Sequence, residues 1–128
     1  SDIVSIILVS MGSNQKKFQL EDKEFSRISA FLRHANKLFS TSNFIKNLDT
    51  LEIVIFIYKE NHLENKNINF KALKEYTNKS DMYLSSFLRS GKETNYLNFK
   101  FSSKDRRIKN YYLEKNSYEF IRKLKEFD

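Results

Sequence analysis

Residues 97–113 read Leu-Asn-Phe-Lys-Phe-Ser-Ser-Lys-Asp-Arg-Arg-Ile-Lys-Asn-Tyr-Tyr-Leu, and this stretch decides the fold. Leu97, Phe99 and Phe101 alternate with polar residues, which is the period-2 pattern of a half-buried strand. Residues 108–113 provide the returning strand. Between the two runs lies a short turn with a single acid, Asp105. Its basic side chains are Lys104, Arg106 and Arg107. The sequence therefore predicts a β-hairpin with a basic tip.

Two short helical segments precede this hairpin. Apolar residues at a spacing of three predict a helix over residues 70–76, and residues 77–80 read as a turn. A second helix is expected from a cap at Ser80 or Asp81 to about Ser90, with Gly91 placed to end it. Its inward-facing residues are Leu84, Phe87 and Leu88. Two helices, a turn and a basic hairpin in this order indicate a winged helix-turn-helix.

Longer elements flank this unit. A 3.6-residue apolar stripe predicts a helix from Glu21 to about Phe39, and a second stripe predicts a terminal helix around residues 118–127. The apolar run from Leu48 to Ile57 is read as a buried helix with Asp49 or Thr50 as its cap. A buried strand is the competing reading, because the run is β-branched. Residues 61–67 read as a loop, and residues 68–70 as a short strand.

The elements together predict an α+β, mainly helical fold. It is a winged helix-turn-helix with a two-stranded wing and flanking N- and C-terminal helices. The length of 128 residues suits one core, so residues 21–128 are expected to form a single winged-helix DNA-binding domain. Residues 1–20 are expected to be an N-terminal extension, partly non-native or flexible, since the chain starts at Ser1 and Met11 offers another start.

The positive charge lies in one half of the chain. Residues 1–64 hold equal numbers of basic and acidic side chains, so the net charge of +7 belongs to residues 65–128. An AT-rich genome would raise the lysine content, but it would scatter lysines through both halves. A clustered basic face is typical of proteins that bind nucleic acid.

The sequence lacks the residues on which several classes of protein function depend. The chain has no Cys, which removes disulfides, thiolate metal sites and Cys nucleophiles. His34 and His62 stand apart without neighbouring ligands, and no glycine-rich phosphate loop is present. No apolar run approaches the roughly 20 residues that a membrane helix needs. We expect no enzyme activity, no metal, no cofactor and no membrane partner.

With that order of elements, residues 25–127 resemble the staphylococcal accessory regulator branch of the MarR-type winged-helix regulators. The resemblance lies in the buried helix that starts near Leu51, the helix-turn-helix of residues 70–88, and the wing. The family often has Asp-Glu-Arg at the wing tip, where this chain has Asp105-Arg106-Arg107. The resemblance implies a cytoplasmic homodimer that regulates transcription, virulence genes included, by binding AT-rich promoter DNA.

The predicted DNA contacts fall on two elements. The helix that begins at Ser80 would enter the major groove, and the wing tip would approach the minor groove. Asp105 is expected to organise the turn by bonding backbone N–H groups or an Arg, rather than to touch DNA. Tyr83 has a second reading, as a side chain that packs inside. The predicted DNA-binding residues are Ser80, Met82, Tyr83, Ser85, Ser86, Arg89, Lys92, Lys100, Lys104, Arg106, Arg107 and Lys109.

Two further readings remain open. The recognition helix carries few cations, and Tyr83, Tyr96 and Tyr111 look exposed. Both features are compatible with a protein-binding module, such as an antirepressor or partner-modulating protein, that binds DNA only non-specifically. A replication-initiator winged helix is weaker, because that class usually needs a longer chain. The apolar stripes of the first and last helices would either form a homodimer or complete the monomer core.

Overall fold

A computed structural model describes residues 19–127. These residues divide into two units, residues 19–33 and residues 34–127. Helix α2 (Asp22–Thr41) crosses the boundary. Most of the predicted N-terminal extension lies outside the described residues, so its boundary at residue 20 stays a prediction. No described helix is both long and apolar enough to cross a bilayer.

The described part of the first unit is the N-terminal half of α2, where the sequence placed its first helix. Asp22 and Glu24 lie in the first turn, where acidic side chains interact favourably with the helix dipole. The apolar stripe of this half is not buried in the protomer: Ile28 is 49% exposed and Leu32 is 50% exposed.

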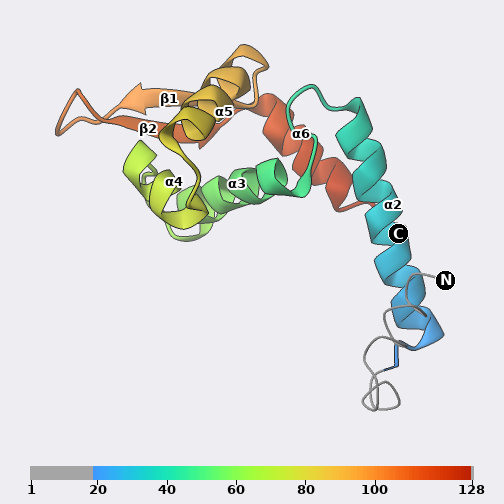
Figure 1. The fold of residues 1–128 in the computed structure, drawn as a ribbon. Helices are drawn as coiled ribbons and strands as arrows, with labels where there is room; N and C mark the ends of the chain where they lie inside the picture. Colours follow the sequence, from blue (N-terminus) through green and yellow to red (C-terminus); the bar gives the residue numbers. More distant parts are fainter. Residues whose placement is uncertain (1–18, 128) are drawn as a thin grey trace. The chain divides into compact units, whose positions relative to one another are not determined.

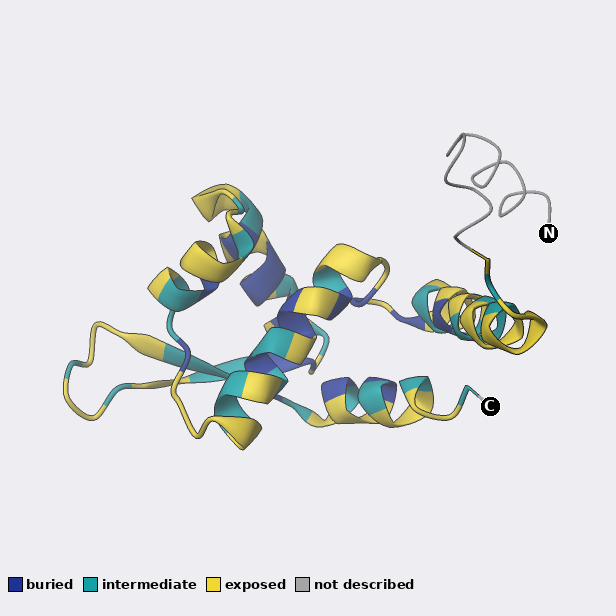
Figure 2. Cartoon of the chain, turned by 90° about the horizontal axis from the view of Figure 1, so that it is seen from below, coloured by how far each residue is buried: buried dark blue, intermediate teal, exposed yellow. Residues whose placement is uncertain are grey.

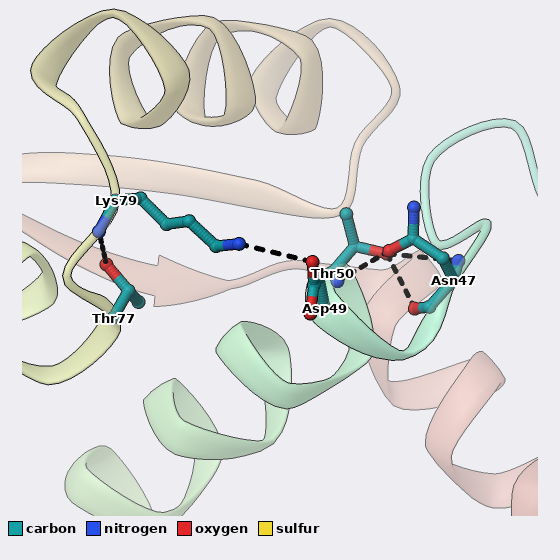
Figure 3. Close-up of polar contacts among 5 residues, drawn as sticks. All are labelled: Asn47, Asp49, Thr50, Thr77 and Lys79. Atoms are coloured by element: carbon teal, nitrogen blue, oxygen red, sulfur yellow. Dashed lines mark hydrogen bonds and ion pairs between the residues drawn. The ribbon is translucent and has the colours of Figure 1, made fainter.

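Helix α3 (Leu48–Tyr58) forms the centre of the second unit, as the helical reading of this run expected. The predicted caps were wrong, because Asn47 is the N-cap and Thr50 completes a capping box with it (Figure 3). The Asp49 carboxylate instead accepts a hydrogen bond from Lys79 Nζ at 3.1 Å. A π-helix, η2 (Lys59–Leu63), follows α3 where the sequence predicted a loop.

The helix-turn-helix consists of α4 (Phe70–Thr77) and α5 (Asp81–Glu93). Asn69 caps α4 and Ser80 caps α5, each accepting a hydrogen bond from a backbone N–H in the first turn. The expectation that Gly91 ends α5 was wrong. The helix continues to Glu93, and Asn95 takes the left-handed conformation with φ of 62°.

Strands β1 (Leu97–Phe101) and β2 (Lys109–Leu113) form the predicted antiparallel wing, with Leu97 opposite Leu113. The predicted strand at residues 68–70 is reduced to one bridge, in which Tyr111 N donates to Ile68 O at 2.7 Å. Figure 1 shows the tip of the hairpin extending beyond α5 and α4. The wing base is therefore tied to the loop before the helix-turn-helix, while the tip stands free of it.

Helix α6 (Lys115–Leu124) closes the second unit. Its Phe120 stacks on Phe39 with ring centroids 6.1 Å apart, and Ser117 Oγ donates to Tyr96 O at 2.7 Å. This face of the last helix thus completes the core of its own protomer. Figure 2 shows the buried residues gathered in the helices at the centre of the picture, each of which also carries exposed residues. The described structure confirms a mainly helical α+β fold with a two-stranded wing.

Candidate nucleic-acid interface

The outer face of α5 is the first part of the candidate interface. Its exposed residues include Met82, which is 82% exposed, and Arg89. Leu84, Phe87 and Leu88 point into the core, as the sequence predicted. Because the inner face is fixed by this packing, the outer face is presented as a rigid surface. The predicted contact residues exposed on this face or at its cap are Ser80, Met82, Ser85, Ser86, Arg89 and Lys92.

Tyr83 differs from its neighbours, because its ring is half-buried and stacks on Phe87 with centroids 6.5 Å apart. Lys79 Nζ lies 5.1 Å from the centroid of the same ring. Tyr83 therefore packs inward, as the second interpretation of this residue predicted. The other two tyrosines that looked exposed were misjudged: Tyr96 is buried and Tyr111 is half-buried. They pack where the wing meets the core, so they offer little surface to a partner protein.

The wing tip is organised by Asp105. Its carboxylate accepts hydrogen bonds from Arg107 N at 3.0 Å and from Arg107 Nε and Nη2 at 3.1 Å each. These bonds hold the pKa of Asp105 below its usual 3.8. The predicted structural role of Asp105 is therefore confirmed. Arg107 is occupied within the turn, whereas Arg106 has no ion-pair partner among residues 19–127.

A pocket separates α5 from the wing, and we call it the seam. Its volume is about 290 Å³ and no Asp or Glu lines it. Phe99 lies at its centre, with Lys92 Nζ 4.7 Å and Lys109 Nζ 4.4 Å from the ring centroid. Arg89 and Ser85 line the side of α5. The fold thus gathers three cations from two elements at one pocket, and cation–π attraction to Phe99 offsets the mutual repulsion of Lys92 and Lys109.

The two faces of the wing carry different residues. Phe99, Phe101 and Lys109 share one face, and Lys100 points to the other because it lies opposite Asn110 in the register. Lys100 lines a different pocket, beside η2 and α6. The structure therefore separates Lys100 from the other predicted contact residues, which belong to the α5 face, the seam or the wing tip.

Four residues that line the seam were not among the predicted contacts. They are Phe70, Leu88, Phe99 and Tyr111. Burial in the pocket region raises the pKa of the Tyr111 hydroxyl above its usual 10.0. Strand alternation gives the face on which Phe99 lies, but not that a lysine of α5 reaches its ring. That contact depends on how the wing packs against the helix.

Each of the two histidines makes a hydrogen bond within the fold. In residues 19–127 no three His, Cys, Asp or Glu side chains come together in a metal-binding group. His62 Nε2 is hydrogen-bonded with Tyr118 OH at 2.6 Å, and His34 Nε2 with Lys123 O. Both rings therefore have local polar partners.

Comparisons with known proteins show likeness in structure alone. No family model matches the chain. No curated protein matches it either. Among solved structures, the heme sensor PefR from Streptococcus agalactiae, in complex with heme, has a TM-score of 0.59 at 16% identity. The match covers 80% of this chain and 67% of PefR.

Two further structures agree with this. A mutant of MepR from S. aureus gives a TM-score of 0.57 at 15% identity, covering 84% of this chain and 75% of MepR. AbsC, a MarR family transcriptional regulator from Streptomyces coelicolor, gives 0.55 at 18% identity, covering 84% and 74%. By its three-dimensional structure, this chain has the winged helix-turn-helix fold of MarR-type regulators.

Proposed function

We propose that the protein is a dimeric, DNA-binding transcriptional regulator. The observation that carries the proposal is the seam, where Arg89, Lys92 and Lys109 converge on a pocket without acidic lining. Cations gathered on one surface neutralise backbone phosphates and release the counterions that the phosphates held. The fold shared with MarR-type regulators supports a regulator rather than an enzyme.

In this proposal α5 enters the major groove and the wing tip approaches the minor groove. Ser85, Ser86 and Arg89 would contact base edges or phosphates. Arg106 would reach the narrow minor groove of AT-rich DNA, where the negative potential is strongest. Promoter DNA rich in A·T pairs, a cytoplasmic location, and placement in the staphylococcal accessory regulator branch all belong to the proposal.

Binding to AT-rich and GC-rich duplexes, measured by fluorescence anisotropy over a salt series, tests this proposal. We expect tighter binding to the AT-rich duplex and a steep loss of affinity with salt. The double variant Arg106→Ala/Arg107→Ala should bind more weakly and flatten the slope by up to about two units. The control Lys37→Ala/Lys125→Ala removes the same charge away from α5 and the wing, and should keep most of the slope.

Unchanged binding of the Arg106→Ala/Arg107→Ala variant at physiological salt would show that the wing assignment is wrong. Weak binding that ignores sequence would favour the alternative, a winged-helix scaffold that binds a partner protein. Met82 and Phe101 are 82% and 55% exposed, and such apolar side chains suit a protein partner. The burial of Tyr96 removes one argument for that alternative.

The proposed dimer uses the exposed stripe of α2, because Ile28 and Leu32 are half exposed on one face of a long helix. The apolar stripe of α6 is already used within its own protomer. Light scattering after size exclusion should give the mass of two chains. Leu32→Glu should give a monomer, while Lys37→Glu on the same helix should remain dimeric. A dimeric Leu32→Glu variant would rule out this face.

A further inference from the structure

A second pocket lies on the other face of the wing, and we call it the η2 pocket. Its volume is about 410 Å³, within the range typical of small-molecule sites. Its walls come from η2, the loop of residues 65–67, strand β2 with Lys100 of β1, and Tyr118 of α6. All of these belong to residues 34–127, so one compact unit builds the whole site.

The charge of the η2 pocket is positive. Two lysines, Lys66 and Lys100, line it, and none of its lining residues is Asp or Glu. Neither ammonium group has an ion-pair partner among the described residues 19–127. Burial, and then the charges of Tyr58 and Glu114, raise the pKa of Tyr118, and Glu114 does not line the pocket. A pocket with two unpaired cations and no lining carboxylate attracts an anion.

The wall beside Tyr118 is aromatic. His62 Nε2 and Tyr118 OH are hydrogen-bonded at 2.6 Å, which fixes both rings. Tyr58 packs against both rings, with centroids 4.9 Å from His62 and 6.4 Å from Tyr118. The His62 and Tyr118 rings are inclined at 69°, so a planar ring can stack on one of them and meet the edge of the other. Base–aromatic stacking is largely indifferent to the identity of the base.

The backbone here has an unusual conformation. Lys59–Leu63 is a π-helix, a rare form that often occurs at functional sites, and Asn65 has φ of 53°. Asn61 Nδ2 donates to Lys66 O at 2.9 Å, yet its buried Oδ1 has no hydrogen-bond partner among the described residues. A buried acceptor without a donor is uncommon in proteins. A small rotation of the Asn61 side chain would let a molecule in the pocket donate a hydrogen bond to Oδ1.

From these observations we propose that the η2 pocket binds a small organic phosphate that carries a planar nitrogen heterocycle, such as a nucleoside monophosphate. Lys66 and Lys100 hold the phosphate as point charges. The ring lies against His62 and Tyr118, and a ring N–H or exocyclic amine faces the amide of Asn61. Hydroxyl groups of the sugar meet the amide of Asn110 and the other polar side chains of the wall.

Isothermal titration calorimetry of the full chain with adenosine 5′-monophosphate tests this site, with adenosine and inorganic phosphate as separate probes. The monophosphate should bind, and each half alone should bind at least about tenfold more weakly, because each lacks one set of contacts. The variant Lys66→Ala/Lys100→Ala should weaken the monophosphate about tenfold or more. The matched control Lys71→Ala/Lys115→Ala removes the same charge outside the pocket and should stay within about twofold.

Amide chemical shifts in a heteronuclear NMR titration locate the occupant. Shifts confined to residues 61–67, Lys100, Asn110 and Tyr118 would support the proposal. Equal binding of inorganic phosphate, or shifts centred on Arg89 and Arg106, would overturn it in favour of general attraction of phosphate to the DNA-binding surface. A short duplex that shifts the η2 pocket residues equally would also overturn it, because the pocket would then serve DNA phosphates. None of these readouts depends on regulation of transcription.

Discussion

Gly91 of α5 lies directly against the side chain of Leu97 at the start of the wing. A Cβ atom at position 91 would be 2.7 Å from Leu97 Cδ1 and 2.9 Å from its Cγ, closer than carbon atoms pack. Leu97 is almost completely buried, so it has no free space to move into. Because Gly91 has no side chain, the start of the wing can pack closely against α5.

Gly91→Ala should lower the free energy of unfolding by about 1 kcal/mol. The gain in helix propensity, about 1 kcal/mol, is smaller than an overpacking penalty of up to about 3 kcal/mol. Urea unfolding of the variant measures this. In a Leu97→Ala background the contacts with Cδ1 and Cγ are gone and only the contact with the Cβ of residue 97, at 3.0 Å, remains, so Gly91→Ala should cost less than in the parent chain. A stabilising effect in the parent chain would mean that Leu97 can move aside.

Asn47→Ala should destabilise the chain by about 1 kcal/mol, because Asn47 Oδ1 accepts the hydrogen bond from Thr50 N at 2.9 Å that begins α3. Figure 3 shows this cap beside the ion pair of Asp49 with Lys79. Asp49→Ala should have an effect below about 0.5 kcal/mol, because that pair is largely exposed. Thermal unfolding of the two variants ranks them, and a larger loss from Asp49→Ala would contradict Asn47 as the cap.

The wing turn should depend on pH through Asp105. Hydrogen bonds from the Arg107 side chain, and then from its backbone, lower the pKa of this carboxyl below 3.8 in the folded chain. The stabilisation of the turn is thus present above the unfolded pKa and is lost as pH falls through the lower folded value. Carbon-13 NMR titration should give Asp105 a pKa below 3.8. In Arg107→Gln the value should rise; an unchanged value would show that Arg107 is not the cause.

Phe99→Leu tests the seam. The substitution keeps an apolar side chain at position 99 but removes the ring that Lys92 and Lys109 approach. Affinity for the AT-rich duplex should fall a few-fold, consistent with the loss of about 0.5–1 kcal/mol per cation–π contact. The salt slope should stay the same, since no charge is removed. Lys92→Ala should instead reduce the slope by about one unit. Identical slopes in both variants would show that Lys92 does not contact phosphate.

Much of the fold could be predicted from local patterns in the sequence. The alternation of Leu97, Phe99 and Phe101 placed β1 correctly, and the apolar spacing placed α2, α4 and α5 within a few residues. Helix ends were harder to predict, because several residues near each end can act as a cap. Asn47 rather than Asp49 capped α3, and α5 passed through Gly91. Which residue caps or ends each helix depended on the contacts that its side chain makes elsewhere in the fold.

In the candidate interface, too, some features could be predicted from neighbouring residues and others depended on the rest of the fold. The sequence identified Asp105 as the residue that organises the wing turn, because its partner Arg107 is only two positions away. It also grouped Lys100 with the other cations of the wing, although the strand register turns Lys100 toward the η2 pocket. The sequence did not predict that Lys92 and Lys109 both approach the ring of Phe99. The contact between Lys92 and Phe99 joins a helix to a strand, so it depends on how these two elements pack.

The sequence by itself determined the order and kind of the elements, the buried face of α5 and the basic turn at the wing tip. These follow from periodicity, turn chemistry and charge over a few neighbouring residues. Only the tertiary structure decided which cations share a surface, that the stripe of α6 is used within the protomer, and that a polar pocket forms behind the wing. These depend on packing between elements distant along the chain, and that packing is set by the shape of the whole core.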